Sequence, residues 1–215
     1  MSNVFIVGGS GKVARRLTPL LVGRGHRVSS LHRKSAQAPE LVELGAIPVE
    51  GDLAALSVED LAASMRGHDT VAFSAGAGGA GMDITRVIDG EGLKKSVDAA
   101  KAAGVTRMLL VSVSPDALRE GERTEGFETY IKVKKLADAY LVASGLDFVI
   151  VRPGTLTEDS GTGRVRADLA IPYGEIPRDD VAEFLAALID RPDLRRLVVE
   201  LTAGSTPIDK VVDRF

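Results

Sequence analysis

The sequence contains no cysteine, only three histidines, no long apolar run and no excess of positive charge. Without cysteine the chain has no disulfide framework, no thiolate nucleophile and no zinc ribbon. Its histidines, His26, His32 and His68, lack the spacing of metal ligands, so we expect no metal site. A net charge of -3 argues against binding to duplex nucleic acid, which would need a basic face.

No apolar run approaches the ~20 residues that a membrane-spanning helix needs. The first residues already have the pattern of a strand and a glycine turn, which leaves no room for a signal peptide. We therefore expect a cytoplasmic protein without membrane contact. The 215 residues, 45% of them hydrophobic, suffice for one substantial core but are few for two enzymatic domains, so we expect one domain over residues 1–215.

Short β-branched runs alternate with amphipathic stretches of helical periodicity along the chain. This alternation is typical of a parallel sheet covered by helices on both faces, a three-layer α/β/α architecture. We predict strands at 3–7, 27–32, 46–49, 70–74, 106–112, 147–152 and 197–202, and helices at 12–24, 38–44, 57–65, 83–103, 125–144 and 179–190. Residues 154–177, rich in glycine, threonine and charge, are the least regular segment. We predict that they form a loop over the carboxyl edge of the sheet.

The first predicted strand runs into a glycine turn and then a helix, with the spacing Gly8-x-x-Gly11-x-x-Ala14. Glycines let the backbone approach a pyrophosphate, and the helix offers unpaired N–H groups and a positive dipole end. This pattern predicts a phosphate cradle, although an ordinary strand-to-helix turn also favours glycine. The residues of the cradle are Gly8, Gly9, Ser10, Gly11, Lys12 and Val13.

The end of the second predicted strand indicates which dinucleotide binds. An acidic residue there would bind both ribose hydroxyls of NAD, whereas an arginine accommodates the additional phosphate of NADP. Here the strand ends in His32-Arg33-Lys34, without an acid before Glu40. We predict a preference for NADP over NAD through Arg33, with Lys34 and Lys12 as helpers. The alternative is a solvated cationic turn.

The third and fourth predicted strands add two further segments at the same edge. The Asp52 side chain could accept a hydrogen bond from an adenine amino group, and Leu53 would cover the adenine ring. Asp52 is equally suited to cap a helix N-terminus. Ser74, Ala75 and Gly76 are small enough for a ribose or pyrophosphate to approach the backbone. For the next glycines, at 78, 79 and 81, a flexible loop is the favoured interpretation.

Tyr130 and Lys134 lie four residues apart on a predicted helix and so project from one face. A lysine ammonium near a phenol lowers the pKa of the phenol, so the tyrosine could exchange a proton with a substrate oxygen beside a nicotinamide. Lys134 would also bind the nicotinamide ribose. The alternative is a coincidence of packing and surface positions, because both residue types are ordinary on helix faces.

The fifth and sixth predicted strands supply the remaining candidates. Ser112 and Ser114 are two apart and could face one pocket, where one of them would bind the reacting oxygen. Ser114 precedes Pro115, so its alternative is a role in a turn. Pro153 and Gly154 end the sixth strand, where they could form a rigid wall against the nicotinamide.

Taken in order, these motifs and the segment Ser144–Gly154 resemble the short-chain dehydrogenase/reductase superfamily. The similarity covers essentially the whole chain and is greatest to the atypical, small NAD(P)-binding branch related to NmrA-like proteins and flavin/biliverdin-IXβ reductases. It implies one NAD(P)-binding Rossmann domain, whose doubly wound sheet has strand order 3-2-1-4-5-6, and the strand at 197–202 would be a seventh. It also implies a tyrosine and lysine pair beside the nicotinamide. Val113 stands where related chains often have a second consecutive serine, so Ser112 and Ser114 both stay open.

The resemblance and the motifs together predict an NADP(H)-dependent oxidoreductase acting on a small carbonyl, quinone or flavin-like substrate. One alternative is a non-catalytic NADP(H)-binding sensor or scaffold protein, and a second is a compact NAD-dependent epimerase or dehydratase. Residues 154–177 are too few for the substrate domain of the larger sugar-nucleotide epimerases. Arg164 and Arg166 suit either an anionic substrate or a solvated strand edge, and the latter is favoured. The chain could be a monomer or a homodimer.

Overall fold

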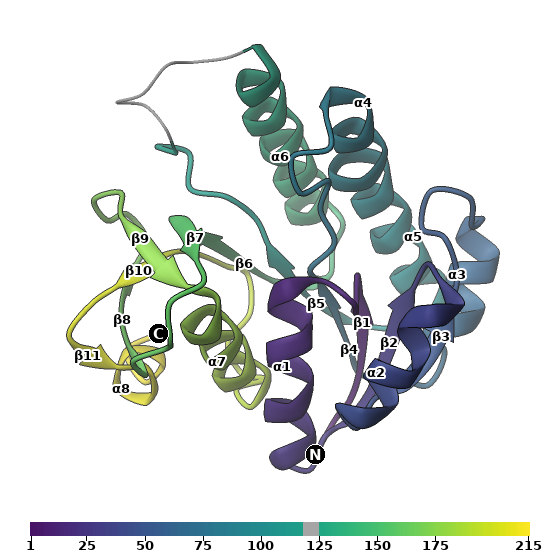
Figure 1. Ribbon diagram of the computed structural model, residues 1–215, viewed down its shortest axis with the longest axis horizontal. Helices are drawn as coiled ribbons and strands as arrows, with labels where there is room; N and C mark the ends of the chain where they lie inside the picture. The colour runs from purple at the N-terminus through teal and green to yellow at the C-terminus, as the bar shows by residue number, and fades with distance from the viewer. Residues whose placement is uncertain (118–124) are drawn as a thin grey trace.

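The computed structural model of the protein describes residues 1–117 and 125–215. Within these residues, one sheet of nine strands has the order β11-β8-β10-β6-β5-β4-β1-β2-β3 (Figure 1). The strands are β1 (Asn3–Val7), β2 (Arg27–His32), β3 (Ile47–Glu50), β4 (Thr70–Phe73), β5 (Arg107–Val111), β6 (Asp147–Pro153), β8 (Arg164–Asp168), β10 (Leu197–Ala203) and β11 (Thr206–Pro207). The helices are α1 (Lys12–Gly23), α2 (Ala38–Glu43), α3 (Val58–Met65), α4 (Met82–Thr85), α5 (Leu93–Ala103), α6 (Glu125–Ala143), α7 (Arg178–Ile189) and α8 (Ile208–Val212), with the short helical segments η1 (Ser35–Gln37) and η2 (Arg86–Gly92).

The predicted strand order is confirmed. Counting only the predicted strands, the order is 3-2-1-4-5-6, and β10 pairs in parallel with β6 as the seventh. The seven predicted strands and most predicted helices appear with small differences at their ends. The order reverses at β1, which lies between β2 and β4. In an open parallel sheet, this reversal is where ligands bind at the carboxyl edge.

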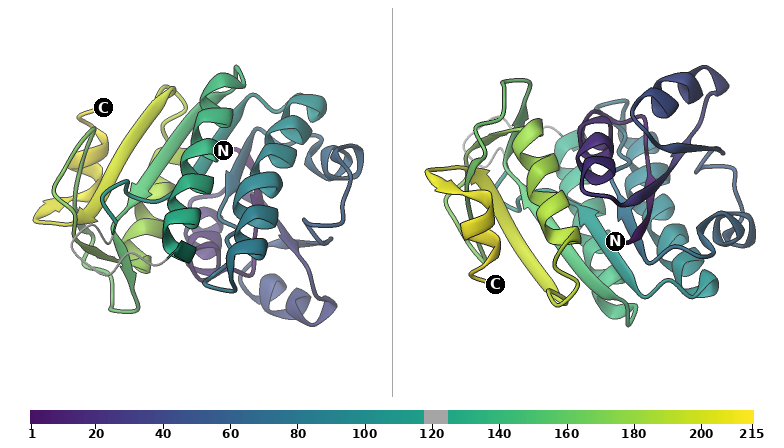
Figure 2. Two further views of the ribbon diagram at one scale, coloured as in Figure 1. Left: turned by 90° about the horizontal axis from the view of Figure 1, so that it is seen from above. Right: turned by 90° about the horizontal axis from the view of Figure 1, so that it is seen from below.

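Two hydrophobic cores lie on opposite faces of the sheet, as the pattern of β1 illustrates. Val4 and Ile6 belong to the core beneath α1 and α7, whereas Phe5 and Val7 belong to the core beneath α3, α5 and α6. Successive residues of a strand point to opposite faces, so a strand buried on both faces is apolar throughout. Figure 2 shows the sheet between the two groups of helices, which form the outer layers.

The prediction of a loop over residues 154–177 is wrong in part, because three short strands form there. β7 (Thr155–Thr157) and β9 (Glu175–Pro177) pair in parallel as a separate two-stranded sheet. β8 pairs antiparallel with both β10 and β11 at the sheet edge. Only Val165 and Ala167 of β8 are buried, and they alternate with exposed Arg164, Arg166 and Asp168. Two apolar residues are a weak strand signal. The exposed arginines agree with the favoured interpretation as a solvated strand edge.

The predicted helix over residues 83–103 is not uniform. It consists of α4, the π-helical segment η2 and α5, and η2 contains Asp89, Gly90 and Gly92. A π-helical turn inserts an additional residue into the helical repeat and often lies at a functional site. None of the helices among the described residues is both long and apolar enough to cross a membrane.

Candidate active site

A cleft of about 640 Å³ lies at the carboxyl edge of the sheet. It follows the turn after β1 and the ends of β2, β3, β4 and β5, and it continues to α6. The predicted residues that line it are Gly8, Ser10, Gly11, Lys12, Val13, Arg33, Asp52, Leu53, Ser74, Ala75, Gly76, Ser112, Tyr130 and Lys134. The structure therefore brings together, in one continuous cavity, segments that the sequence separates by more than a hundred positions.

The turn after β1 packs so closely against the neighbouring segments that it requires glycine. Gly8 has φ +86°, and a Cβ there would lie 2.6 Å from the Cα of Ala75. A Cβ on Gly9 would lie 2.5 Å from the Cβ of Ser30, so Gly9 packs against β2 and does not line the cleft. The Ser10 hydroxyl oxygen is buried at the cleft and has no hydrogen-bond partner among the described residues. An unpartnered hydroxyl beside a helix N-terminus fits a phosphate oxygen, so these residues are suited to a dinucleotide.

The end of β2 presents Arg33 to the cleft. Its side chain is exposed, and it forms no ion pair with the residues that the structure describes. The side-chain oxygen of Gln37 accepts hydrogen bonds from the backbone N–H groups of Arg33, at 3.2 Å, and Lys34, at 2.9 Å, and so holds this turn. Lys34 does not line the cleft. Arg33 is thus placed to meet an anion in the cleft, whereas Lys34 lies outside it.

Asp52 and Leu53 line the cleft after β3. Asp52 Oδ1 also accepts a hydrogen bond of 3.0 Å from the Ala54 backbone, which fixes the turn that follows. Leu53 is 7% exposed and forms a flat apolar wall. Asp52 can therefore fix the turn and contact the adenine at the same time, because only its Oδ1 is used by the Ala54 N–H.

The segment after β4 separates the cleft from a second cavity of about 420 Å³. Gly78 lines the cleft, whereas Gly79 and Gly81 line the second cavity together with Met82 and Phe127. Ala77 and Tyr130 line both cavities. A molecule in the second cavity would therefore lie against the tyrosine that the cleft also reaches.

Lys134 is buried at the end of the cleft and is already paired. Its Nζ donates a hydrogen bond of 3.0 Å to the carbonyl of Val111 and lies 3.5 Å from Asp89 Oδ1. Asp89 is 2% exposed, and its other oxygen accepts a 2.9 Å hydrogen bond from the Ala77 N–H. A carboxylate this close offsets the charge of the ammonium that would otherwise act on Tyr130.

The predicted fall in the pKa of Tyr130 is wrong. Burial, followed by the carboxylates of Asp89 and Asp138 and then by Tyr173, raises the pKa of Tyr130 above that of an ordinary phenol. Both effects disfavour the phenolate, because the charged form loses hydration and meets negative charge. Tyr130 is therefore a neutral phenol at physiological pH and can donate a hydrogen bond.

Ser112 and Ser114 have different surroundings. Ser112 lines the cleft, and its hydroxyl donates a hydrogen bond of 2.6 Å to Asp138 Oδ1. The other oxygen of Asp138 accepts a 3.0 Å hydrogen bond from Arg152. Ser114 lies outside the cleft, and its hydroxyl accepts a hydrogen bond of 3.3 Å from the N–H of Asp116. The N–H groups of Ser112 and Ser114 still pair with Val151 and Pro153 of β6, at 2.7 and 3.1 Å, but only the first serine lines the cleft.

Pro153 and Gly154 do not line the cleft. The Gly154 N–H donates a 2.9 Å hydrogen bond to Leu201 in β10, and a Cβ on Gly154 would overlap the carbonyl of Gly174. The chain reaches the cleft later, at Leu156, and again at Arg178. The small sheet of β7 and β9, rather than the end of β6, therefore forms this wall.

Three functional candidates were absent from the sequence prediction, namely Asp89, Asp138 and Arg178. A signal for two of them was present. Tyr130, Lys134 and Asp138 are spaced by four residues, and Asp89 precedes Leu93 and Val97 by four and eight. An ionisable residue in register with a helix's buried face requires a partner. No comparable signal marked Arg178, whose role depends on how β7 and β9 pair.

A model of the family described as NAD(P)H-binding matches residues 8–192. The Bacillus subtilis protein named "Uncharacterized sugar epimerase YhfK" is 36% identical over 214 residues, covering 99% of both chains. The solved structure entitled "Putative NAD-dependent epimerase/dehydratase from Bacillus halodurans" has 35% identity and a TM-score of 0.91, covering 100% of both chains. The oxidoreductase ylbE from Lactococcus lactis has 26% identity and a TM-score of 0.85, covering 99% of this chain and 96% of that one.

The family match includes the glycine turn after β1, the ends of the next four strands and α6. These are the segments that line the cleft, so the comparison and the geometry point to the same ligand, a nicotinamide dinucleotide. The chain belongs to the NAD(P)H-binding family, which agrees with its sequence resemblance to the atypical short-chain dehydrogenase/reductases.

Proposed function

We propose that the protein is an NADP(H)-dependent oxidoreductase that reduces a small carbonyl, quinone or flavin-like substrate. The observation that carries this proposal is the continuous cleft from Arg33 to Tyr130 and Lys134. A dinucleotide whose phosphates lie at Gly8–Val13 has its adenine end toward Asp52 and its nicotinamide toward Tyr130. The second cavity, which shares Tyr130 with the cleft, offers space for the substrate beside the nicotinamide.

A reduced nicotinamide held in the cleft would supply a hydride to the substrate. Tyr130 then supplies the proton, because its raised pKa keeps the phenol protonated. The oxygen of a reduced carbonyl is a stronger base than a phenolate, so the proton moves from the Tyr130 hydroxyl to that oxygen. The phenolate that remains regains a proton from water.

Lys134 and Ser112 position the groups that take part in this reaction, namely the nicotinamide ribose and the hydroxyl of Tyr130 or of the substrate. The ammonium of Lys134 is fixed by the Val111 carbonyl and Asp89, and it can donate one more hydrogen bond to the nicotinamide ribose. Ser112 donates its hydrogen to Asp138, so its oxygen faces the cleft as an acceptor. Ser112 can therefore accept a hydrogen bond from the Tyr130 hydroxyl or from a substrate hydroxyl.

The preference for NADP over NAD rests on Arg33. Its guanidinium has no competing ion pair among the described residues, and no acidic residue ends β2. A planar guanidinium binds a phosphate through two parallel hydrogen bonds, which a ribose hydroxyl cannot match.

Steady-state kinetics with NADPH and a panel of carbonyls, quinones and flavins tests the proposal. We expect turnover of at least one compound, and we expect Tyr130→Phe to lower kcat by roughly 10²- to 10⁴-fold, the range for loss of a general acid. Calorimetry with NADPH separates loss of chemistry from loss of binding. Tight binding without any turnover would support the sensor or scaffold alternative, and unchanged kcat in Tyr130→Phe would refute the proton-donor role.

The names of two relatives raise a second candidate, an epimerase. An epimerase that oxidises a sugar hydroxyl needs a tyrosine able to accept a proton. The raised pKa of Tyr130 leaves little phenolate at neutral pH to accept that proton. NAD retained through purification, and not exchanged with added cofactor, would favour the epimerase.

A further inference from the structure

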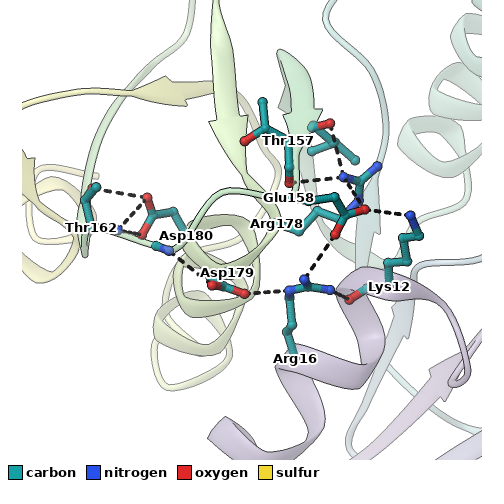
Figure 3. Close-up of polar contacts among 10 residues, drawn as sticks. Lys12, Arg16, Thr157, Glu158, Thr162, Arg178, Asp179 and Asp180 are labelled. Atoms are coloured by element: carbon teal, nitrogen blue, oxygen red, sulfur yellow. Dashed lines mark hydrogen bonds and ion pairs between the residues drawn. The ribbon is translucent and has the colours of Figure 1, made fainter.

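Glu158, which directly follows β7, lies among three cationic side chains (Figure 3). Its Oε1 is 2.6 Å from Lys12 Nζ and 3.0 Å from a guanidinium nitrogen of Arg178, and its Oε2 is 3.2 Å from Arg16. Lys12 and Arg178 both line the cleft, whereas Arg16 does not. One carboxylate therefore bridges the two cations that the cleft presents beside its phosphate turn.

The two cations occupy positions that normally attract anions. Lys12 is the first residue of α1, Arg178 is the first residue of α7, and neither helix has a side-chain cap. Cations are unfavourable at a helix N-terminus, where the dipole end is positive, unless an anion is present. Ser10 adds an independent observation, because its buried hydroxyl faces the same part of the cleft without a partner among the described residues. Lys12, Arg178 and the Ser10 hydroxyl can therefore bind more negative charge than the single carboxylate of Glu158 provides.

Two of the three cations, Arg178 and Arg16, are also held by partners other than Glu158. Arg178 donates hydrogen bonds to the carbonyls of Leu156, at 3.1 Å, and Thr157, at 3.0 Å. Arg16 binds Asp179 at 2.5 Å and donates to the carbonyl of Lys12 at 2.8 Å. The Glu158 side chain, in contrast, is 52% exposed and is held only through its carboxylate. Exposed ion pairs contribute about 0–1 kcal/mol each, so the carboxylate can leave at little cost while the two arginines stay, and the exposed Lys12 ammonium is then free to meet another anion.

We propose that the Glu158 carboxylate is an internal competitor of the cofactor's pyrophosphate for Lys12 and Arg178. The inference rests on the proposed placement of the dinucleotide in the cleft. A pyrophosphate carries two negative charges and can use the Ser10 hydroxyl and the α1 N-terminus as well, so it displaces the single carboxylate. Glu158 thereby weakens cofactor binding, and Arg178 becomes a cofactor-binding residue that the sequence did not reveal.

The competition concerns the pyrophosphate, which NADH and NADPH share. A change at Glu158 should alter the affinity for both dinucleotides by the same factor. A change at Arg33 should alter the affinity for NADPH alone, because only NADPH has the additional phosphate. The two effects can therefore be measured separately.

The experiment is a calorimetric titration of the purified protein with NADPH and with NADH. Glu158→Gln keeps the size of the side chain and removes its charge, and we expect the Kd of both dinucleotides to fall roughly two- to fivefold. Arg178→Ala should raise both Kd values by roughly fivefold or more. Glu175→Gln is the matched control, because Glu175 is an exposed glutamate on the same two-stranded sheet, and it should change neither value. Thermal unfolding of each variant confirms that it is folded.

Unchanged or weaker binding of both dinucleotides by Glu158→Gln would overturn the inference. Weaker binding would mean that Glu158 braces the small sheet over the bound cofactor instead. An effect on NADPH but not NADH would place the additional phosphate, rather than the pyrophosphate, at this cluster and would equally contradict it. Failure of the unaltered protein to bind either dinucleotide would refute the proposed cofactor site itself, which is a separate result.

Discussion

Asp89 is the carboxylate that, after burial itself, contributes most to the raised pKa of Tyr130. It lies on a π-helical turn, holds the Ala77 N–H and is paired with Lys134, and its charge contributes to the raised pKa of Tyr130. Tyr130 is also influenced by Asp138 on its own helix and by Tyr173 from the segment between β8 and β9. Because the Asp89 carboxylate lies beside it, the Lys134 ammonium acts on Tyr130 less as a positive charge than it acts on the cofactor as a hydrogen-bond donor.

Asp89→Asn should lower the pKa of Tyr130, because it removes a negative charge that disfavours the phenolate. A raised pKa keeps the phenol protonated to higher pH, so we expect reduction by the unaltered protein to persist far into the alkaline range. In Asp89→Asn the activity should decline at lower pH, as the tyrosine ionises earlier. The pH dependence of kcat and the ultraviolet absorbance of tyrosinate both measure this.

The control is Asp83→Asn, which removes a carboxylate whose side chain is 93% exposed on neighbouring α4. It should leave the pH profile unchanged. If Asp89→Asn lowers activity equally at every pH, Asp89 has only a structural role.

At the scale of elements, the sequence predicted what local periodicity determines. β1 is apolar on both faces, and the glycine spacing after it led directly to the turn at Gly8 and Gly11. The small sheet of β7 and β9 escaped prediction because each strand has only three residues and its partner lies about twenty positions away. The sequence left Ser112 and Ser114 undecided, and the fold adds that Ser112 lines the cleft whereas Ser114 does not.

For the ionisable residues of the site too, the sequence revealed local spacing but not the contacts between distant elements. Tyr130 and Lys134 were predicted because one helix carries both at fixed spacing. The pairing of Lys134 with Asp89, and of Glu158 with Lys12, joins elements that only the tertiary fold brings together. Residue types and spacing therefore predicted the position of the tyrosine but not the direction of its pKa shift.

The contacts between β5 and the end of α7 allow a further prediction at the scale of elements. Arg107 is 6% exposed, and its guanidinium donates hydrogen bonds of 2.8 to 3.4 Å to carbonyls at the end of α7 and just beyond it. These carbonyls belong to Leu188, Ile189, Arg191 and Leu194. Arg107→Met would leave buried acceptors without a donor, so we expect a loss of about 3 kcal/mol in the free energy of unfolding.

Urea unfolding followed by circular dichroism measures this loss. Arg195→Met is the control, because Arg195 is 65% exposed and its ion pair with Asp147 spans 3.8 Å. It should change the free energy of unfolding by less than about 0.5 kcal/mol. Equal effects of the two substitutions would show that Arg107 does not stabilise the end of α7.

At the scale of the whole molecule, the cleft lies between segments that belong to the two opposite faces of the sheet. Its walls come from the β1–α1 turn and Arg178 on one side, and from η2 and α6 on the other. A ligand that contacts both sides must stabilise the folded chain as a unit, since it binds only when all of these segments are in place. Cofactor choice can therefore be determined from stability, independently of any substrate.

We expect NADPH to raise the Tm more than NADH does at equal concentration. A ligand at a hundred times its Kd adds about 2.7 kcal/mol, which corresponds to roughly 5–10 °C for a chain of this size. If Arg33 binds the additional phosphate, NADPH should bind roughly tenfold more tightly than NADH, and Arg33→Ala should bring the two Tm shifts together by reducing only that of NADPH. Lys34→Ala is the matched control, because Lys34 is the adjacent cation but lies outside the cleft, and it should preserve the difference. A larger shift with NADH, or a preference for NADPH that survives Arg33→Ala, would contradict the assignment of Arg33 and require another residue to select the cofactor.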